Sequence, residues 1–238
     1  MPLKDRKILI VGLGLIGGSY AEALKRKGFE VGAVTRSQAS VDYALEHGMI
    51  DCGTTEVTPG FLGRYDLVVF ALYPHVLLEW VEKYQQFLKP GALLTDVTGV
   101  KSAVVYKVQE MLRDDLEFVG AHPMAGREVY GVRNADSSIF VGANYIVTPT
   151  PNNSEAAVQD IEELGRILGF SRISRLSPGK HDEMWSELFL LNRDELLSQL
   201  DLFIGQMGTI RDAVSDGDTE KLRALMRLST ERRALFDK

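Results

Sequence analysis

Residues 8–19 read Ile8-Leu9-Ile10-Val11-Gly12-Leu13-Gly14-Leu15-Ile16-Gly17-Gly18-Ser19. The first four residues predict a buried strand, and three glycines with the spacing G-x-G-x-x-G follow it where a helix begins. In this context Gly12 permits a tight turn, Gly14 lets a pyrophosphate approach the backbone, and Gly17 lets the helix pack closely on the strand. The free N–H groups at the start of the helix attract the same anion. The segment therefore predicts a dinucleotide-binding turn, and we expect residues 12–17 to contact the cofactor.

The rest of the chain shows where this turn lies in the fold. Up to about residue 149, short apolar runs alternate with amphipathic stretches. Strands are expected at residues 8–11, 31–34, 67–71, 93–96, 118–120 and 145–147, and helices at 17–27, 40–47, 76–87 and 102–112. Strict alternation is typical of right-handed parallel crossovers in a doubly wound sheet.

Beyond Pro149 the pattern becomes mainly helical. Helices are expected at residues 154–168, 184–203 and 219–235, with a short strand at 171–176 and a turn at 216–218. We therefore predict an α/β fold, with a Rossmann-type doubly wound, mostly parallel sheet in residues 1–177. A shortened all-helical domain is expected in residues 178–238.

Composition excludes several classes of function. The 238 residues include 27 basic and 33 acidic side chains, for a formal charge of −6, which argues against a nucleic-acid partner. A single cysteine, Cys52, excludes an internal disulfide and a cysteine-cluster metal site, and no metal site is expected. No apolar run reaches 18 residues and no signal peptide is recognisable at the start. We expect a cytoplasmic protein without a membrane span.

The choice of dinucleotide depends on the end of the second predicted strand. NAD-selective sites place a carboxylate there, which accepts a hydrogen bond from the ribose 2′-hydroxyl. This chain instead has Thr35, Arg36 and Ser37. The Arg36 guanidinium could hold a 2′-phosphate and Ser37 could donate to it. We predict NADP rather than NAD, the alternative being that Arg36 is an exposed loop residue without a ligand.

Of the four histidines, His122 is the best candidate for chemistry. His47 and His75 are expected at the surface. His122 directly follows a predicted strand, and reactive groups in open α/β sheets gather at the carboxyl ends of strands. An imidazole there is suited to general-base work near neutral pH. We predict that His122 is catalytic, a purely structural histidine being the alternative.

Together these motifs resemble the prephenate/arogenate dehydrogenase family of tyrosine biosynthesis. The resemblance rests on residues 12–19, Asp96-Val97-Thr98-Gly99-Val100-Lys101, His122-Pro123-Met124-Ala125-Gly126, residues 142–149 and Met184-Trp185. It implies oxidative decarboxylation of prephenate or arogenate, with hydride transfer to NAD(P)⁺. In this reaction His122 bonds the ring hydroxyl and helps remove its proton.

The same resemblance implies functions for further residues. It places Thr98, Arg127, Glu128 and Trp185 on the substrate side, and Ala71, Leu72 and Lys101 with the cofactor. Many relatives carry a serine, where this chain has Gly99, that orients the catalytic histidine. Either Thr98 or Ser102 is therefore expected to supply that hydrogen bond, or His122 is held less firmly.

The carboxyl-terminal part departs from the family pattern. Relatives carry a block of helices between a His-Asp pair and a Met-Trp helix, whereas here His181-Asp182 leads almost directly to Met184-Trp185. This implies an internal deletion that removes the arginine for a substrate carboxylate. Arg127, Arg193 and Arg211 are the remaining candidates for pairing with that carboxylate.

The remaining carboxyl-terminal helices carry an apolar stripe. It consists of Leu188, Leu191, Leu196, Leu200 and Phe203. Such a stripe predicts a homodimer formed through these helices, the alternative being that it packs on the first domain.

Two other functions stay open from the sequence. One is another hydroxyacid dehydrogenase or imine reductase on the same fold, which would usually use a lysine on the helical domain. Lys180 precedes the predicted helix and is a poor candidate for that lysine. The other is a non-catalytic NADP-binding sensor or disabled paralogue. The sequence does not decide between prephenate and arogenate.

Overall fold

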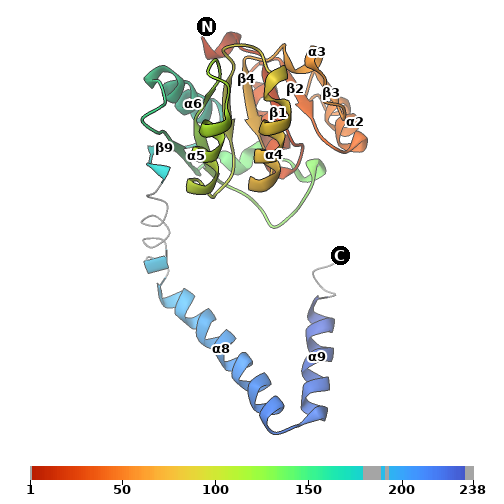
Figure 1. Ribbon diagram of the computed structural model, residues 1–238. Coiled ribbons are helices and arrows are strands. Elements are labelled where there is room, and N and C mark those ends of the chain that lie inside the picture. Colours follow the sequence, from red (N-terminus) through yellow and green to blue (C-terminus); the bar gives the residue numbers. More distant parts are fainter. Residues whose placement is uncertain (1, 179–188, 191–192, 234–238) are drawn as a thin grey trace. The chain divides into compact units, whose positions relative to one another are not determined.

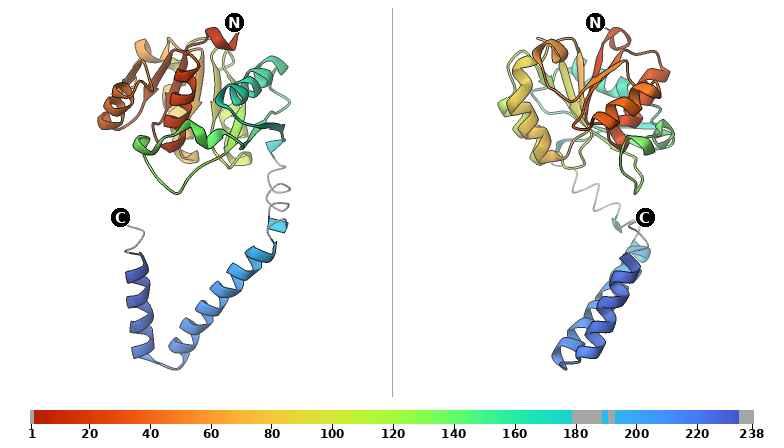
Figure 2. Two further views of the ribbon diagram at one scale, coloured as in Figure 1. Left: turned by 180° about the vertical axis from the view of Figure 1, so that it is seen from behind. Right: turned by 90° about the vertical axis from the view of Figure 1, so that its right-hand side faces the viewer.

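The computed structural model describes residues 2–178, 189–190 and 193–233 (Figures 1 and 2). The chain divides into two units, residues 1–181 and 182–238. Trp185, Leu188 and Leu191, which the sequence assigned to the substrate side and to the apolar stripe, lie outside the described residues.

The first unit is built on a six-stranded sheet in the order β3-β2-β1-β4-β5-β6, with every neighbouring pair parallel. The strands are β1 (Ile8–Val11), β2 (Val31–Val34), β3 (Cys52–Thr54), β4 (Leu67–Phe70), β5 (Leu93–Asp96) and β6 (Glu117–Phe118). β2 and then β3 are added on one side of β1, whereas β4, β5 and β6 are added on its other side. The strand order therefore reverses between β1 and β4, and ligands of such sheets bind outside the strand ends at this point. The expected Rossmann-type fold is confirmed.

Helices cover both faces of this sheet. They are α1 (Leu15–Arg26), α2 (Gln38–Glu46), α3 (Pro59–Leu62), α4 (Pro74–Tyr84), α5 (Ser102–Met111) and α6 (Glu155–Leu168). The face with α4 and α5 is toward the viewer in Figure 1, and α1 lies on the opposite face, seen from behind in Figure 2. Alternate residues of β1 serve the two faces, because Ile8 and Ile10 pack with α1 and α6 whereas Leu9 and Val11 pack with α4 and α5. Both faces of the sheet are therefore core, as its apolar strands require.

A second, three-stranded sheet corrects the expectation of strict alternation. It contains β7 (Gly120–Met124), β8 (Asn144–Thr148) and β9 (Arg172–Arg175) in that order, with β7 and β8 antiparallel. The single strand expected at residues 118–120 is in fact the end of β6 and the start of β7. The N–H of Val119 still donates to Leu94 of the main sheet (3.0 Å), and the chain then enters the second sheet. An apolar run of three residues gives no sign of that change of sheet.

Smaller elements were missed because they are short. The pattern did not predict β3, α3 or the 3₁₀ turns at Leu3–Asp5, Val132–Asn134 (η3) and Ser137–Phe140 (η4). The helix expected at residues 76–87 is α4 followed by a 3₁₀ turn at Gln85–Phe87. The start of α3 nevertheless carries a local signal, since the Thr58 side chain accepts from Phe61 N–H and Pro59 follows it. Ser37 and Ser154 cap α2 and α6 in the same way.

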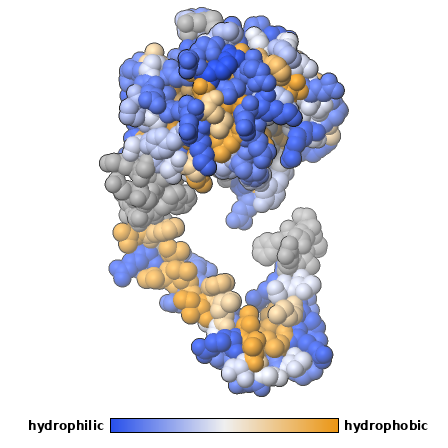
Figure 3. All heavy atoms as spheres, viewed as in Figure 1, coloured by the Kyte–Doolittle hydropathy of each residue, from blue (hydrophilic) through white to orange (hydrophobic). Residues whose placement is uncertain are grey.

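Residues 193–233 of the second unit form α8 (Arg193–Ser215) and α9 (Thr219–Arg233). The turn between them is at the expected residues, and Gly217 takes a positive φ of 67° there. The helix expected to end at residue 203 continues to Ser215. Large apolar side chains lie exposed along α8 (Figure 3). No helix among the described residues is both long and apolar enough to cross a lipid bilayer.

Candidate active site

The glycine turn connects β1 to α1 and has the geometry of a dinucleotide cradle. Gly12 has a φ of +101°, and a Cβ there would overlap the carbonyl oxygen of Ala71. A Cβ at Gly17 would overlap the carbonyl oxygen of Gly12 and lie 2.9 Å from Ala71 Cβ. At Gly14, the residue that caps α1, a Cβ would meet nothing within 4 Å. Packing therefore requires two of the glycines, while the third borders open space at the start of the helix, where free N–H groups attract an anion.

Ala71 and Leu72 lie beside this turn. Ala71 N–H donates to Val11 (2.8 Å), and Leu72 Cδ2 lies 3.1 Å from where a Gly12 Cβ would be. The loops after β1 and β4 are thus in contact at the reversal of strand order. The expected placement of Ala71 and Leu72 with the cofactor residues is compatible with this geometry.

The end of β2 presents the three residues expected to choose the dinucleotide. Thr35 is half-buried, and its N–H donates to Thr54 (3.2 Å). Arg36 is exposed, and no acidic side chain in the described part of the chain pairs with it. Ser37 Oγ accepts from Ser40 N–H (3.3 Å), which leaves the hydroxyl hydrogen available to a ligand. The arrangement can accept an anion at this strand end.

His122 is half-buried in β7, opposite Ile146 of β8. It therefore lies within a strand of the second sheet and not directly after a strand of the main sheet, as the sequence had suggested. Its ring nevertheless reaches the loop that follows β5, because a Cβ on Gly99 would lie 3.4 Å from both Cε1 and Nε2 of the imidazole. His47 and His75 are exposed, as expected.

A buried ion pair lies next to this histidine. Both Asp96, the last residue of β5, and Lys101, just before α5, have fully buried side chains. Lys101 Nζ lies 2.7 Å from each carboxylate oxygen of Asp96 and also donates to the carbonyl of Ala121. Asp96 Oδ1 accepts from the N–H of Ala121 (3.0 Å). Burial lowers the pKa of Lys101, and Asp96 acts in the opposite direction.

Thr98 belongs to the same network. Its hydroxyl donates to Asp96 Oδ2 and lies 3.4 Å from Lys101 Nζ, and its N–H donates to Asp96 Oδ2 (3.1 Å). Thr98 is thus committed to the ion pair, whereas the sequence offered it as a substrate residue or as the partner of His122. Lys101 likewise points into the protein, and cofactor contact by Lys101 stays a prediction.

Arg127 and Glu128 lie exposed on the loop after β7. Arg127 is already paired with Asp136 (2.6 Å). Hydrogen bonds from Ser138, and then the Arg127 guanidinium, lower the pKa of Asp136 to about 2. A substrate carboxylate would have to compete with Asp136 for Arg127. Arg211 pairs with Asp212 on α8 (2.6 Å), and Arg193 begins that helix.

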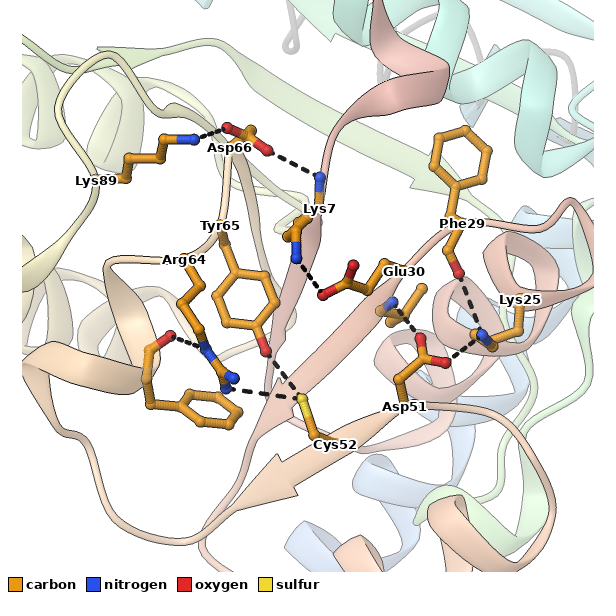
Figure 4. Close-up of polar contacts among 12 residues, drawn as sticks. Lys7, Lys25, Phe29, Glu30, Asp51, Cys52, Arg64, Tyr65, Asp66 and Lys89 are labelled. Carbon is orange, nitrogen blue, oxygen red and sulfur yellow. Dashed lines mark hydrogen bonds and ion pairs between the residues drawn. The ribbon is translucent and has the colours of Figure 1, made fainter.

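The amino ends of the strands carry a different polar cluster (Figure 4). Asp66 accepts from Lys89 and from Lys7 N–H (2.9 Å), and Lys7 Nζ pairs with Glu30 (2.8 Å). Cys52 Sγ lies 3.2 Å from the Tyr65 hydroxyl, and burial together with this thiol raises the pKa of Tyr65. These contacts join strand starts and lie at the edge of the sheet opposite to the glycine turn.

Comparison with known families assigns the chain. Residues 20–170 match the family model "Prephenate dehydrogenase, nucleotide-binding domain", and residues 152–228 match "Prephenate dehydrogenase, dimerization domain". The chain belongs to the prephenate dehydrogenase family. The prephenate dehydrogenase of Bacillus subtilis is 26% identical over 272 aligned positions, covering 92% of this chain and 73% of the relative. That of Lactococcus lactis is 35% identical over 147 residues, covering 60% and 41%.

Solved structures of prephenate dehydrogenase family members have the same fold. A Synechocystis arogenate dehydrogenase matches with a TM-score of 0.68 at 22% identity, covering 97% of this chain and 99% of that one. The prephenate dehydrogenase of A. aeolicus, in complex with hydroxyphenyl propionate and NAD⁺, matches with a TM-score of 0.69 at 22% identity, covering 97% and 98%.

The alignment also bears on the length of this family member. It spans 272 positions with the Bacillus subtilis enzyme although this chain has only 238 residues. The relative therefore contains residues that have no counterpart here. Their assignment to the segment before Met184 stays a prediction.

Proposed function

We propose that this protein is a prephenate or arogenate dehydrogenase of tyrosine biosynthesis. The observation that carries the proposal is the juxtaposition of His122 with the dinucleotide cradle. Gly12, Ala71 and Gly99 follow β1, β4 and β5, which are adjacent parallel strands, and a Cβ on Gly99 would contact the His122 ring. Neighbouring strands lie about 4.8 Å apart, so the loops after β1 and β5 are separated by about 10 Å. A general base and a pyrophosphate site therefore share one edge of the sheet.

The residues at this edge fit a nicotinamide dinucleotide. Residues 12–17 and the start of α1 would hold its pyrophosphate, with Ala71 and Leu72 alongside. A bound nicotinamide dinucleotide would supply the acceptor for the hydride that leaves the substrate. The 2′-phosphate of NADP would lie near Thr35, Arg36 and Ser37, at the end of β2.

His122 supplies acid–base chemistry to this reaction. Its imidazole accepts the proton of the ring hydroxyl of the substrate. The negative charge that develops on this oxygen assists loss of hydride from the carbon that carries it. Loss of carbon dioxide then leaves its electron pair in the ring, which becomes aromatic, and the proton returns to the phenolic oxygen. The protein mainly holds the reactants in place.

The test is turnover with each substrate. We expect prephenate or arogenate, with NADP⁺, to give NADPH and 4-hydroxyphenylpyruvate or tyrosine, respectively. His122→Asn should lower kcat by about 10²- to 10⁴-fold without weakening dinucleotide binding. His75→Asn, a change at an exposed histidine, should leave kcat unchanged. Tight NADPH binding without turnover on either substrate would favour the sensor function, and an active His122→Asn variant would remove the proposed base.

The cofactor preference is tested separately. We propose NADP because Arg36 is exposed at the end of β2 without an acidic partner among the described residues. Arg36→Asp should lower kcat/KM with NADP⁺ by about 10- to 100-fold and raise it with NAD⁺. A wild-type protein that strongly prefers NAD⁺ would contradict the proposal.

We further propose that residues 178–238 form a shortened dimerisation and substrate domain. The match to a dimerization-domain model and the exposed apolar side chains of α8 support a homodimer. Arg127, Arg193 and Arg211 are the proposed cationic partners of the substrate, together with Glu128 and Trp185 as candidate substrate-side residues.

A further inference from the structure

The contacts of the buried Asp96–Lys101 pair converge on one residue. Asp96 accepts from the N–H of Ala121, and Lys101 donates to the carbonyl of the same residue. Ala121 directly precedes His122, and all three side chains of this set are fully buried. Because the ion pair bonds to both the N–H and the C=O of Ala121, it fixes the backbone from which the His122 side chain extends.

The topology explains why side chains make these two bonds. β7 is the edge strand of its sheet, so alternate residues turn their N–H and C=O groups away from β8. Ala121 is one such residue, and a buried peptide group without partners would cost free energy. The next is Pro123, which has no N–H to satisfy and is tolerated at edges. The pair thus takes the place of a missing strand at the position before His122.

The same pair flanks the loop that lies beside the imidazole. Asp96 and Lys101 flank residues 97–100, and Thr98 within that loop bonds to both. Gly99 of this loop is the residue whose Cβ would lie 3.4 Å from the His122 ring. One buried ion pair therefore holds both the backbone before His122 and the loop that lies beside the His122 ring.

We propose that Asp96 and Lys101 are positioning residues that set where the His122 imidazole lies, acting through Ala121 and the loop 97–100. The inference rests on the proposed function of His122 as the general base. It replaces cofactor contact as the function of Lys101. Displacement of the His122 imidazole should lower the rate of turnover but not the affinity for the dinucleotide. The reason is that the glycine turn follows β1, two strands away from β5.

The test is a double-mutant cycle with His122. The variant Asp96→Asn/Lys101→Met removes both charges, so that neither is left buried and unpaired. We expect kcat to fall roughly 10- to 100-fold while the dinucleotide Kd stays unchanged. In a His122→Asn background the same pair of changes should lower the residual rate by less than about twofold, because the pair acts through the imidazole. A merely structural effect would lower both rates by the same factor.

A matched control removes the ion pair at the other edge of the sheet. Asp66→Asn/Lys89→Met deletes a pair that also holds a backbone N–H, that of Lys7, and should leave kcat unchanged. An unaltered kcat in Asp96→Asn/Lys101→Met would overturn the proposal, as would a weakened dinucleotide Kd with normal kcat at saturation. If that variant does not fold, Thr98→Val decides, since it weakens the network without unpairing a charge, and an unchanged kcat again overturns it.

The cycle separates this proposal from the proposed function. If His122→Asn retains full activity, the general base is wrong and the positioning proposal falls with it. If His122→Asn is inactive while Asp96→Asn/Lys101→Met is normal, only the positioning proposal fails.

Discussion

Gly14 and Gly17 have different functions in the glycine turn, and substitution by alanine should separate them. A Cβ at Gly17 would overlap the Gly12 carbonyl, so Gly17→Ala should destabilise the protein by about 2–4 kcal/mol. A Cβ at Gly14 meets open space, so Gly14→Ala should fold with nearly normal stability but weaken dinucleotide binding by about tenfold. Urea unfolding and titration with NADPH measure the two effects.

An exposed glycine serves as the control for both changes. Gly60→Ala, in α3, also places its Cβ in open space but lies far along the chain from the turn. It should alter neither stability nor NADPH affinity appreciably. A Gly14→Ala protein that binds NADPH normally would show that the open space at the start of α1 is not the pyrophosphate site.

At the scale of residues, the sequence was informative where the constraint is local. Gly12, Gly14 and Gly17 lie within six residues, so their spacing predicts the local backbone geometry directly. The surroundings of each glycine agree with the function expected of it. Lys101 could not be interpreted in this way, because its carbonyl partner, Ala121, is 20 positions away. Only the path of the chain from β5 to β7 brings the two together.

At the scale of elements, Asp66 connects the starts of three strands. Its N–H donates to Lys7 before β1 (2.9 Å), its carboxylate accepts from Lys7 N–H, and its carbonyl accepts from Leu93 of β5 (2.9 Å). Burial acts to raise the pKa of Asp66, but the bonds from Lys89 and Lys7 outweigh it, and the pKa lies below its ordinary value of 3.8. The ionised form is therefore the one that stabilises the fold.

The lowered pKa of Asp66 predicts that the difference in stability between the wild-type protein and Asp66→Asn depends on pH. Because the folded pKa of Asp66 is lowered, its contribution is present above about pH 4 and is lost as the pH falls through the folded value. Asp66→Asn should cost about 1–2 kcal/mol at pH 7, and less as the pH is lowered. Urea denaturation at several pH values measures this. Asp114→Asn, at an exposed position, should show no difference, and a constant cost for Asp66→Asn at all pH values would contradict the prediction.

Long elements were predictable and the junction between the two sheets was not. α6 shows a clear apolar period, a serine cap and Gly169 at its end with a φ of +99°, so each local signal agrees. β6 has only two residues, and β7 contains Pro123, which lowers its resemblance to a strand. Consequently the sequence placed His122 after a strand of the main sheet, although it correctly placed it near the carboxyl edge.

At the scale of the whole molecule, the change of pattern after Pro149 predicted a helical second part but not the extent of α8. The helix was expected to end at residue 203, yet apolar residues continue through Met207, Ile210 and Ala213. Leu197, Leu200, Ile204 and Met207 follow one another at spacings of three and four residues, which places them on one side of the helix, and all four are exposed. Two of these positions lie beyond the stripe that the sequence suggested.

This side of α8 is the proposed contact between two copies of the chain. Leu200→Glu/Ile204→Glu would force charges into an apolar interface, each costing about 1–3 kcal/mol, so the dimer should dissociate at least about 100-fold more readily. Sedimentation velocity over a range of concentrations measures this shift. Thr209→Glu, on the opposite side of the same helix, should leave the assembly intact. Because the glycine turn belongs to the first unit, the monomeric variant should still bind NADPH. Equal sedimentation of the double variant and the wild-type protein would show that the dimer, if formed, uses another surface.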